Sequence, residues 1–155
     1  MKNKLLLIFV FLSFGIYAQT SDETLVKETI DDFFKAFHAK DSLAMQQVVS
    51  STIYLQTVGK DKAGEFLLRT ENYTDLVHSI TSIPDSVNFQ ERLTDYTIKI
   101  DAHMANAWVP YEFWLNGAFH HCGVNSFQLY KENDAWQIIY LIDTRRTEGC
   151  TPSSK

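Results

Sequence analysis

A long run of alternating apolar and polar positions extends from residue 107 to residue 146, where β-branched and aromatic side chains dominate. Two polar interruptions divide this run, Asn116-Gly117 and residues 131–134. The pattern predicts three antiparallel strands joined by two tight hairpins. Asn-Gly is typical of a type I′ turn, because both central residues of that turn have positive φ. With Asn116 and Gly117 as the loop, Glu112 is expected opposite His121 on the neighbouring strand.

The first half of the chain carries helix signals. Residues 20–23 form a capping-box pattern, and the apolar residues after them recur at helical spacing, which predicts an amphipathic helix ending near His38. A second, short helix is expected to be capped by Asp41 or Ser42 and to end near Val49.

The middle of the chain adds a short strand at residues 52–58, which Gly59 ends. Apolar positions between residues 63 and 80 predict one long or two short helices that stop before Pro84. Residues 91–100 alternate as a half-exposed strand. This order favours an α+β fold in which three or four helices of the N-terminal half pack on the concave face of a curved antiparallel sheet.

The two ends of the chain bear on location and covalent structure. Residues 1–18 combine two lysines, a short apolar run and a final small residue, as in a secretory signal peptide cut before Gln19. The apolar run is too short for a membrane span, and no stable membrane anchor is expected. Residues 19–155 are expected to form a single exported domain, periplasmic or secreted. In that oxidising setting, Cys122 and Cys150 either form a disulfide or remain one buried and one free thiol.

Charge and motif content exclude several classes of function. The chain has 14 basic and 19 acidic residues, and its only run of basic residues in the expected mature part is Arg145-Arg146, so nucleic acid is not an expected partner. His120 and His121 are consecutive on a strand and face opposite sides, which disfavours a metal site. There is no glycine-rich phosphate loop, so no cofactor is expected either.

The expected strand register gathers polar residues on one apolar sheet face, as in a small-molecule pocket. These candidate residues are Trp108, Glu112, Trp114, His121, Asn125, Tyr140, Thr144 and Arg146. Glu112 and His121 are either an acid/base pair or a structural pair of buried polar groups. Arg146 either clamps a ligand carboxylate or phosphate or pairs with Glu112. Asp143 and Arg145 are expected on the opposite face with Cys122 and His120, unless a bulge shifts the last strand.

The order of the predicted elements, closing on a Trp136-x-Ile138 strand, resembles the nuclear transport factor 2-like (NTF2-like, SnoaL-like, cystatin-like) superfamily over essentially the whole mature chain. The segments beginning at Trp108, His121 and Asp143 are similar to small exported bacterial members with no assigned reaction. The resemblance implies a cone whose inner sheet face and first helix enclose a ligand cavity.

This superfamily includes ketosteroid isomerases, dehydratases, polyketide cyclases and non-enzymatic binders, so the resemblance leaves the chemistry open. Isomerase-like members carry a carboxylate base on the first strand shortly before the glycine. Gln56 occupies the matching position here and cannot accept a proton, so chemistry of the steroid-isomerase type is not expected.

Three hypotheses about function follow. The first is an exported domain that binds an aromatic or anionic small molecule, with Tyr54 and Gln56 completing the ligand-binding set. The second is a cofactor-independent isomerase, dehydratase or cyclase in which His121, oriented by Glu112, moves a proton. The third is a non-catalytic structural or partner-binding module.

The opposite face of the sheet is also apolar. Val109, Tyr111 and Phe113 are expected there, and a soluble monomer rarely leaves such a patch bare. A two-fold homodimer through these residues is therefore predicted, as the resemblance also suggests. The rival explanation is that the C-terminal tail folds over this face, tied down by Cys122 and Cys150.

Overall fold

The computed structural model describes residues 21–153, so the expected leader, residues 1–18, lies outside the described part. The helices are α1 (Asp22–Ala39), α2 (Ser42–Gln47) and α3 (Tyr73–Thr81). The strands are β1 (Val49–Lys60), β2 (Phe66–Glu71), β3 (Phe89–Leu93), β4 (Thr97–Asp101), β5 (Met104–Leu115), β6 (Ala118–Glu132) and β7 (Ala135–Thr144).

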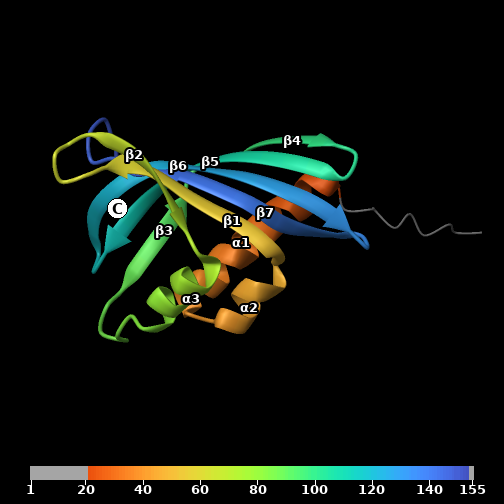
Figure 1. Ribbon diagram of the computed structural model, residues 1–155, viewed down its shortest axis with the longest axis horizontal. Coiled ribbons are helices and arrows are strands. Elements are labelled where there is room, and N and C mark those ends of the chain that lie inside the picture. Colours follow the sequence, from red (N-terminus) through yellow and green to blue (C-terminus); the bar gives the residue numbers. More distant parts are fainter. Residues whose placement is uncertain (1–20, 154–155) are drawn as a thin grey trace, which may run out of the picture.

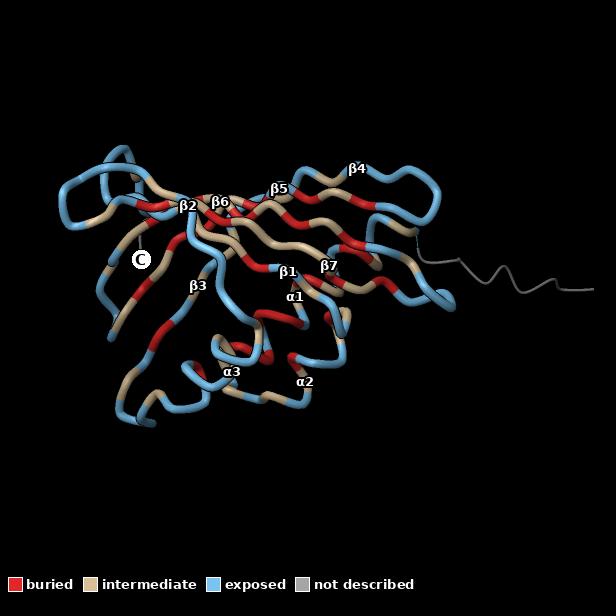
Figure 2. The backbone as a smooth tube through the Cα atoms, in the orientation of Figure 1, coloured by how far each residue is buried: buried red, intermediate tan, exposed pale blue. Residues whose placement is uncertain are grey.

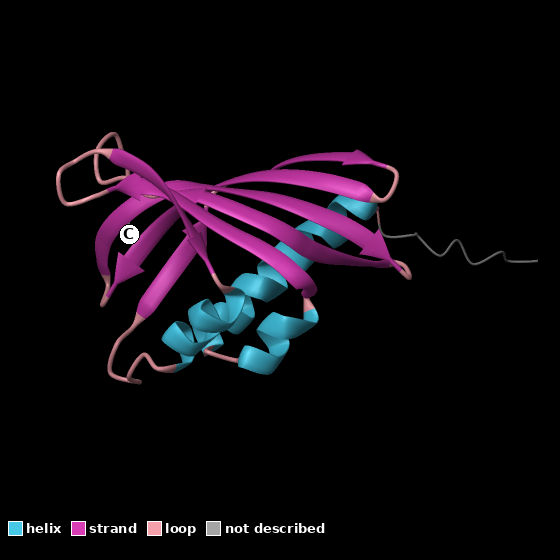
Figure 3. Ribbon diagram, in the orientation of Figure 1, coloured by secondary structure: helices cyan, strands magenta, loops and turns pink. Residues whose placement is uncertain are grey.

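The strands form one curved sheet in the order β2-β1-β7-β6-β5-β3, with β4 paired to the other end of β5. The β1–β7 pair is parallel and the others are antiparallel. All three helices lie on the concave side of the sheet, and α1 runs diagonally beneath it (Figure 1, Figure 3). The α+β architecture expected from the sequence is confirmed.

Helix α1 packs against the sheet as its spacing predicts. Ser21 caps it by accepting a hydrogen bond from the Thr24 backbone N–H, and Lys40 ends it with a φ of 56°. The buried residues concentrate along α1 and the central strands (Figure 2). Their apolar side chains form one core: Val26, Ile30, Phe33, Phe34 and Phe37 from α1, and Val109, Phe127, Leu129 and Ile138 from the sheet.

Two segments differ from the sequence-based expectation. Residues 66–71 form an edge strand paired with β1 instead of a helix. The turn before this strand needs Gly64, whose φ is 88°, and Asp61 supports the turn by accepting bonds from two backbone N–H groups. Residues 91–100 are divided between two strands, because β3 and β4 pair with opposite ends of the long strand β5.

A β-bulge changes the expected pairing of β5 with β6. The hairpin has the predicted two-residue turn, but His120 is an extra residue on β6, so Phe113 and not Glu112 lies opposite His121. Glu112 instead faces Cys122. Because side chains alternate with period 2, one extra residue moves every later side chain of β6 to the other face relative to β5.

A second irregularity acts in the same way on β7. Leu129 pairs with Ile138, but Gln128 pairs with Tyr140, so Ile139 is the extra residue. As a result, Asn125 is paired with Asp143. Asp143 and Arg145 are therefore on the concave side of the sheet, which is the alternative that the sequence left open for a bulged last strand.

The residues predicted to form the dimer surface do not lie on an exposed face of the sheet. Val109 and Tyr111 are 0% and 3% exposed and face the helices, and Phe113 also lies on the concave side. The convex face carries Glu112, which is buried beneath the C-terminal tail: Ser153 donates to it through its backbone N–H (2.7 Å) and its hydroxyl (2.9 Å). The tail is tied down by the Cys122–Cys150 disulfide, as the rival explanation required, but it covers the face of Glu112 and not the face that carries Val109, Tyr111 and Phe113.

Candidate functional site: a cavity beneath the sheet

A cavity of about 580 Å³ lies between the concave face of the sheet and helices α1 and α3. Its apolar lining comes from both layers and from the segment after α3: Phe33, Phe34, Phe37, Leu55, Leu76, Ile80, Ile83, Pro84, Val87, Phe89, Phe113, Leu115 and Leu141. Pockets of this size and composition are typical of small-molecule sites, where a few polar groups orient an apolar ligand.

The polar lining includes residues brought together by the strand order. Glu91 comes from β3, His121 and Asn125 from β6, Asp143 from β7, and Arg145 directly follows β7. The two bulges are responsible for this group, because without them His121 and Asn125 would share a face with Glu112. The cavity thus combines apolar walls with one cluster of ionisable side chains.

Glu91 is the acid of this cluster. Asn125 donates a hydrogen bond to its carboxyl Oε1 at 2.7 Å, and its backbone N–H donates to His38 Nε2 at 2.8 Å, which ties β3 to α1. Burial raises the pKa of Glu91 to about 7, and the charge of Asp143 acts in the same direction, against the Asn125 hydrogen bond and Arg145. Glu91 therefore exchanges its proton near neutral pH.

Asp143 and Arg145 form an ion pair beside Glu91. Arg145 Nε donates to Asp143 Oδ2 at 2.9 Å, and the Thr57 hydroxyl donates to Asp143 Oδ1 at 2.5 Å. Only 10% of the Asp143 side chain is exposed, against 54% of Arg145. Within residues 21–153 the terminal nitrogens of Arg145 make one long contact, 3.5 Å to Thr57 Oγ1, so they retain hydrogen-bonding capacity for a ligand.

His121 closes the cluster as a neutral ring. It stacks on Phe113 with a centroid distance of 4.8 Å, and its Nδ1 lies 2.9 Å from Nδ1 of His120. Burial and the neighbouring charges of His120 and Arg145 lower the pKa of His121 to about 4. The imidazole is thus uncharged near neutral pH and contributes an aromatic face and a hydrogen-bonding nitrogen.

The expected acid/base pair of Glu112 and His121 does not form. The bulge at His120 places the two side chains on opposite faces of the sheet. Glu112 accepts hydrogen bonds from Trp114 Nε1 (3.0 Å) and from Ser153, so it anchors the tail.

Most other predicted ligand-binding residues also lie on the convex face. Trp108 is 51% exposed there, and Tyr140 donates to Gln56 Oε1 at 2.5 Å while its ring lies beside Tyr54. Thr144 accepts from the Val124 backbone N–H. Trp114 lies under the guanidinium of Arg92, and Arg146 donates to tail carbonyls.

Two of the predicted residues, His121 and Asn125, are on the cavity face of the sheet; Gln56 borders the cavity, but its side chain bonds to Tyr140 on the convex face. Glu91 was missed by sequence reasoning. The available signal was the period-2 spacing from Phe89, which is 6% exposed and points into the core, to Glu91 two residues later. Arg145 was expected on the face opposite the predicted site, unless a bulge shifted the last strand.

Residues 21–153 hold no group of three or more His, Cys, Asp or Glu side chains placed to bind a metal ion. In the same residues, every helix is too short or too polar to cross a membrane.

Comparison with known proteins identifies the fold. No family model matches the sequence, and no curated protein does. An NTF2-like protein from Cytophaga hutchinsonii superimposes with a TM-score of 0.65 at 11% identity, over 82% of this chain and 100% of that one. A protein of unknown function with a cystatin-like fold from Nostoc punctiforme gives 0.64 at 13% identity, over 82% and 92%.

An NTF2-like protein of unknown function from Shewanella baltica gives a TM-score of 0.61 at 16% identity, over 83% of this chain and 98% of that chain. At these identities the likeness concerns the fold alone. The chain has the NTF2-like, cystatin-like fold, as the resemblance in its sequence implied.

Proposed function

We propose that this protein binds a flat aromatic molecule with an acidic head group in the cavity beneath the sheet. The observation that carries the proposal is the cavity itself, about 580 Å³ of mostly apolar lining with a cluster of hydrogen-bonding groups on the strands. A ring system gains most from burial against aromatic walls, since ring edges and faces attract one another. The Phe37 and Phe89 rings already meet edge to face at 5.3 Å on this lining.

The head group of the ligand is expected to contact Arg145. A guanidinium binds a carboxylate through parallel N–H bonds, and Arg145 Nε is already oriented by Asp143. Asn125 contributes an amide on the same face. Protonation of Glu91 lowers the negative charge of the cluster, so an anionic head group is accepted when Glu91 is neutral.

Binding can be tested with three probes that share one ring system: 2-naphthoate, 2-naphthol and naphthalene. Fluorescence titration of residues 19–155 should rank 2-naphthoate first at slightly acid pH. Because a hydrogen bond to a charged group contributes about 1.5–3 kcal/mol, Arg145→Gln should weaken 2-naphthoate binding roughly tenfold or more. Arg92→Gln, the same charge change on the convex face, is the control and should bind like wild type.

Binding of 2-naphthoate that is indifferent to Arg145→Gln would overturn the assigned head-group site. If none of the three probes binds at millimolar concentration, the ligand-binding proposal fails and a structural or partner-binding role takes its place.

The second candidate is an enzyme that transfers protons, with Glu91 in place of the expected Glu112–His121 pair. A carboxyl group with a pKa of about 7 in a largely apolar cavity is suited to act as a general base or acid near neutral pH. In this reading Glu91 takes a proton from carbon next to a carbonyl, and Asn125 or Arg145 steadies the resulting oxyanion.

A simple assay tests this second candidate. The protein should catalyse exchange of the hydrogens next to the carbonyl of 2-tetralone for deuterium from heavy water. The rate of this exchange is measured by NMR. Removal of a general base lowers such a rate by roughly 10²–10⁴-fold, so Glu91→Gln should bring the exchange close to the uncatalysed rate. Equal exchange by wild type and Glu91→Gln would exclude Glu91 as the base.

We also propose that the protein is exported and that it pairs through its convex sheet face. The Cys122–Cys150 disulfide supports export, because such bonds persist in oxidising compartments. Three large apolar side chains on the convex face, Met104, Trp108 and Tyr130, are 56%, 51% and 45% exposed. Their exposure supports a homodimer through a different set of residues from the one predicted.

A further inference from the structure

The position of Arg145 depends on a short segment beyond the last strand. Strand β7 ends at Thr144, and Arg145 is the next residue. On one side the Arg145 backbone N–H donates to the Val58 carbonyl of β1 at 3.0 Å. On the other side Arg146 and Cys122 exchange two backbone hydrogen bonds of 3.0 Å, an isolated bridge to β6.

The regular ladder between β6 and β7 is interrupted just before this bridge. The Thr144 carbonyl accepts a hydrogen bond from the Tyr111 hydroxyl at 2.9 Å. Gly123 leaves room for this arrangement, since a Cβ there would lie 1.7 Å from the Thr144 oxygen. Arg145 is therefore not held by a continuous ladder to β6. On that strand it is flanked by the hydrogen bond from the Val124 backbone N–H to the Thr144 hydroxyl and by the Cys122–Arg146 bridge.

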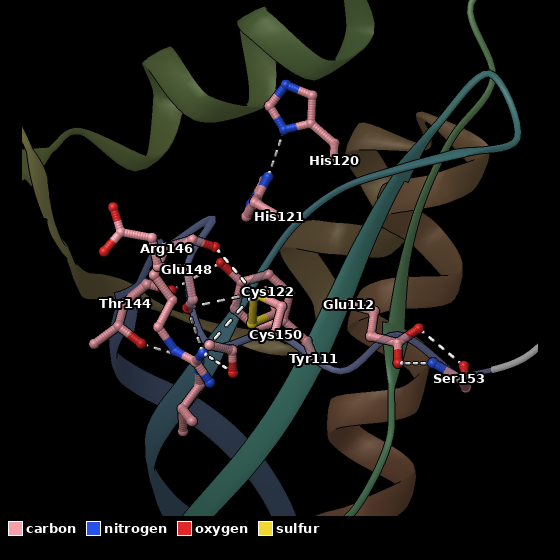
Figure 4. Close-up of a disulfide and its surroundings, with 12 residues drawn as sticks. Tyr111, Glu112, His120, His121, Cys122, Thr144, Arg146, Glu148, Cys150 and Ser153 are labelled. Carbon is pink, nitrogen blue, oxygen red and sulfur yellow. Dashed lines mark hydrogen bonds between the residues drawn. A yellow bond between two sulfur atoms is a disulfide. The ribbon is translucent and has the colours of Figure 1, made fainter.

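The bridge is itself tied by the disulfide. After Arg146 the chain turns at Gly149, whose φ is 65°, and returns Cys150 to Cys122 (Figure 4). The Arg146 guanidinium lies within this turn and donates to the carbonyls of Glu148 (2.9 Å) and Gly149 (2.7 Å). The covalent bond thus joins one residue of the bridge, Cys122, to Cys150, which lies four residues after the other bridge residue, Arg146.

We infer that the Cys122–Cys150 disulfide is a positioning element for Arg145, and that it sets the affinity of the cavity for an anionic aromatic ligand. The inference rests on the proposed ligand-binding function. Chain ends fray when nothing ties them down. With the disulfide open, the segment from Arg145 onward samples more positions, so the guanidinium spends less time against Asp143 and the cavity. Arg146, expected from the sequence to touch the ligand, serves the turn instead.

A ligand-free measurement tests the positioning directly. The Nε–H of Arg145 donates to Asp143, so NMR of ¹⁵N-labelled residues 19–155 should show it as a distinct signal that exchanges slowly with water. The variant Cys122→Ala with Cys150→Ala should lose that slow exchange while its other amide signals keep their protection. If the variant does not fold, reduction of wild type by dithiothreitol, which becomes a cyclic disulfide as two thiols form, serves instead.

Ligand affinity provides the second measurement, with 2-naphthoate as the probe. Opening the disulfide should weaken binding roughly three- to tenfold, less than complete loss of a charged hydrogen bond. In the Arg145→Gln background it should have no further effect, and naphthalene should bind all variants alike. The matched control is Glu112→Ala, which removes the acceptor of both Ser153 hydrogen bonds, frees the tail beyond Cys150 and leaves the disulfide closed. It should bind like wild type.

The inference is overturned if Arg145 Nε–H stays protected after the disulfide is opened. It is also overturned if opening the disulfide weakens naphthalene binding as much as 2-naphthoate binding, and weakens 2-naphthoate binding as much in Arg145→Gln as in wild type. The second result would mean that the disulfide only stabilises the fold. Failure of wild type to bind 2-naphthoate would count against the proposed function, and the NMR measurement would still decide the positioning.

Discussion

Asn125 and Glu91 are joined by a hydrogen bond of 2.7 Å that spans strand β5, because β6 and β3 both pair with β5. Asn125 is only 3% exposed, so its amide needs a partner inside the protein, and the Glu91 carboxyl provides it. The same contact places the amide and the ionisable group of the cavity side by side. The protonation state of Glu91 is therefore central to the proposed ligand binding and to stability.

Affinity for 2-naphthoate should fall as the pH rises through about 7. The probe keeps its charge from about pH 5.5 upward, because an ordinary carboxyl group has a pKa near 4. Glu91, whose pKa is about 7, becomes negative in this range beside Asp143 and repels the probe. The dissociation constant should rise roughly three- to tenfold, as for one like charge in a partly screened site.

Glu91→Gln should bind 2-naphthoate with the same affinity from pH 6 to pH 8, because its amide does not ionise. Titration calorimetry across this range measures both proteins. A pH dependence that persists in the Gln variant would assign the titration to a different group.

Two groups of the cavity should contribute in opposite directions to the pH dependence of folding stability. Glu91 has a raised pKa in the folded state, so its contribution is present below its ordinary pKa of 4.5 and is lost as the pH rises to about 7. His121 has a lowered pKa, so its contribution is present above 6.5 and is lost as the pH falls towards 4. The two effects partly cancel in the wild type.

Single substitutions should separate these contributions. In urea unfolding between pH 4.5 and pH 7, Glu91→Gln should become less stable as the pH falls, and His121→Gln less stable as the pH rises. At pH 8 the Glu91→Gln protein should exceed wild type by on the order of 1–2 kcal/mol, a value reduced because water reaches the cavity. Parallel curves for the two variants would contradict the assignment.

Gly123→Ala should destabilise the fold strongly. The added Cβ would lie 1.7 Å from the Thr144 carbonyl oxygen and 2.7 Å from the Tyr111 ring, and a backbone atom cannot simply rotate away. A loss of about 3 kcal/mol or more is expected, as for severe overpacking. Gly59→Ala is the matched control, because nothing lies within 4 Å of its new Cβ, and it should stay within about 0.5 kcal/mol of wild type.

The convex face should support a homodimer. Sedimentation of residues 19–155 at tens of micromolar should show a dimer, which Trp108→Glu converts to a monomer by placing a charge in the apolar contact. Lys62→Glu, in the exposed turn between β1 and β2, should leave the dimer intact. A wild-type protein that sediments as a monomer at these concentrations would refute the proposal.

Expression with residues 1–18 present should give an exported product that begins at Gln19. Mass spectrometry of the periplasmic or secreted fraction measures the mass and the new N-terminus. Leu7→Arg, which interrupts the apolar run, should keep the protein in the cytoplasm. Full-length wild-type protein in the cytoplasm would count against export.

Much of the fold was predictable because it rests on local patterns. The helical spacing of the phenylalanines between residues 33 and 37 and the Asn116-Gly117 turn each depend on neighbours a few residues away. The misassigned segment, residues 66–71, became a strand because β1 offers it a pairing edge, which no local pattern reveals.

Which residues line the cavity was not predictable in the same way. Two extra residues, His120 and Ile139, decide which side chains face the helices. In strands that are apolar on both faces, the change of phase caused by a bulge cannot be located from the sequence. The expected Glu112–His121 pair failed for this reason.

The sequence by itself determined the first two helices, the Asn116-Gly117 turn and the α+β class, because these follow from side-chain periodicity and backbone preference. Only the tertiary structure decided that Glu91, Asn125 and Arg145 meet in one cavity and that Glu112 holds the tail. Those outcomes depend on pairing between distant strands, where a shift of one residue exchanges the two faces of a sheet.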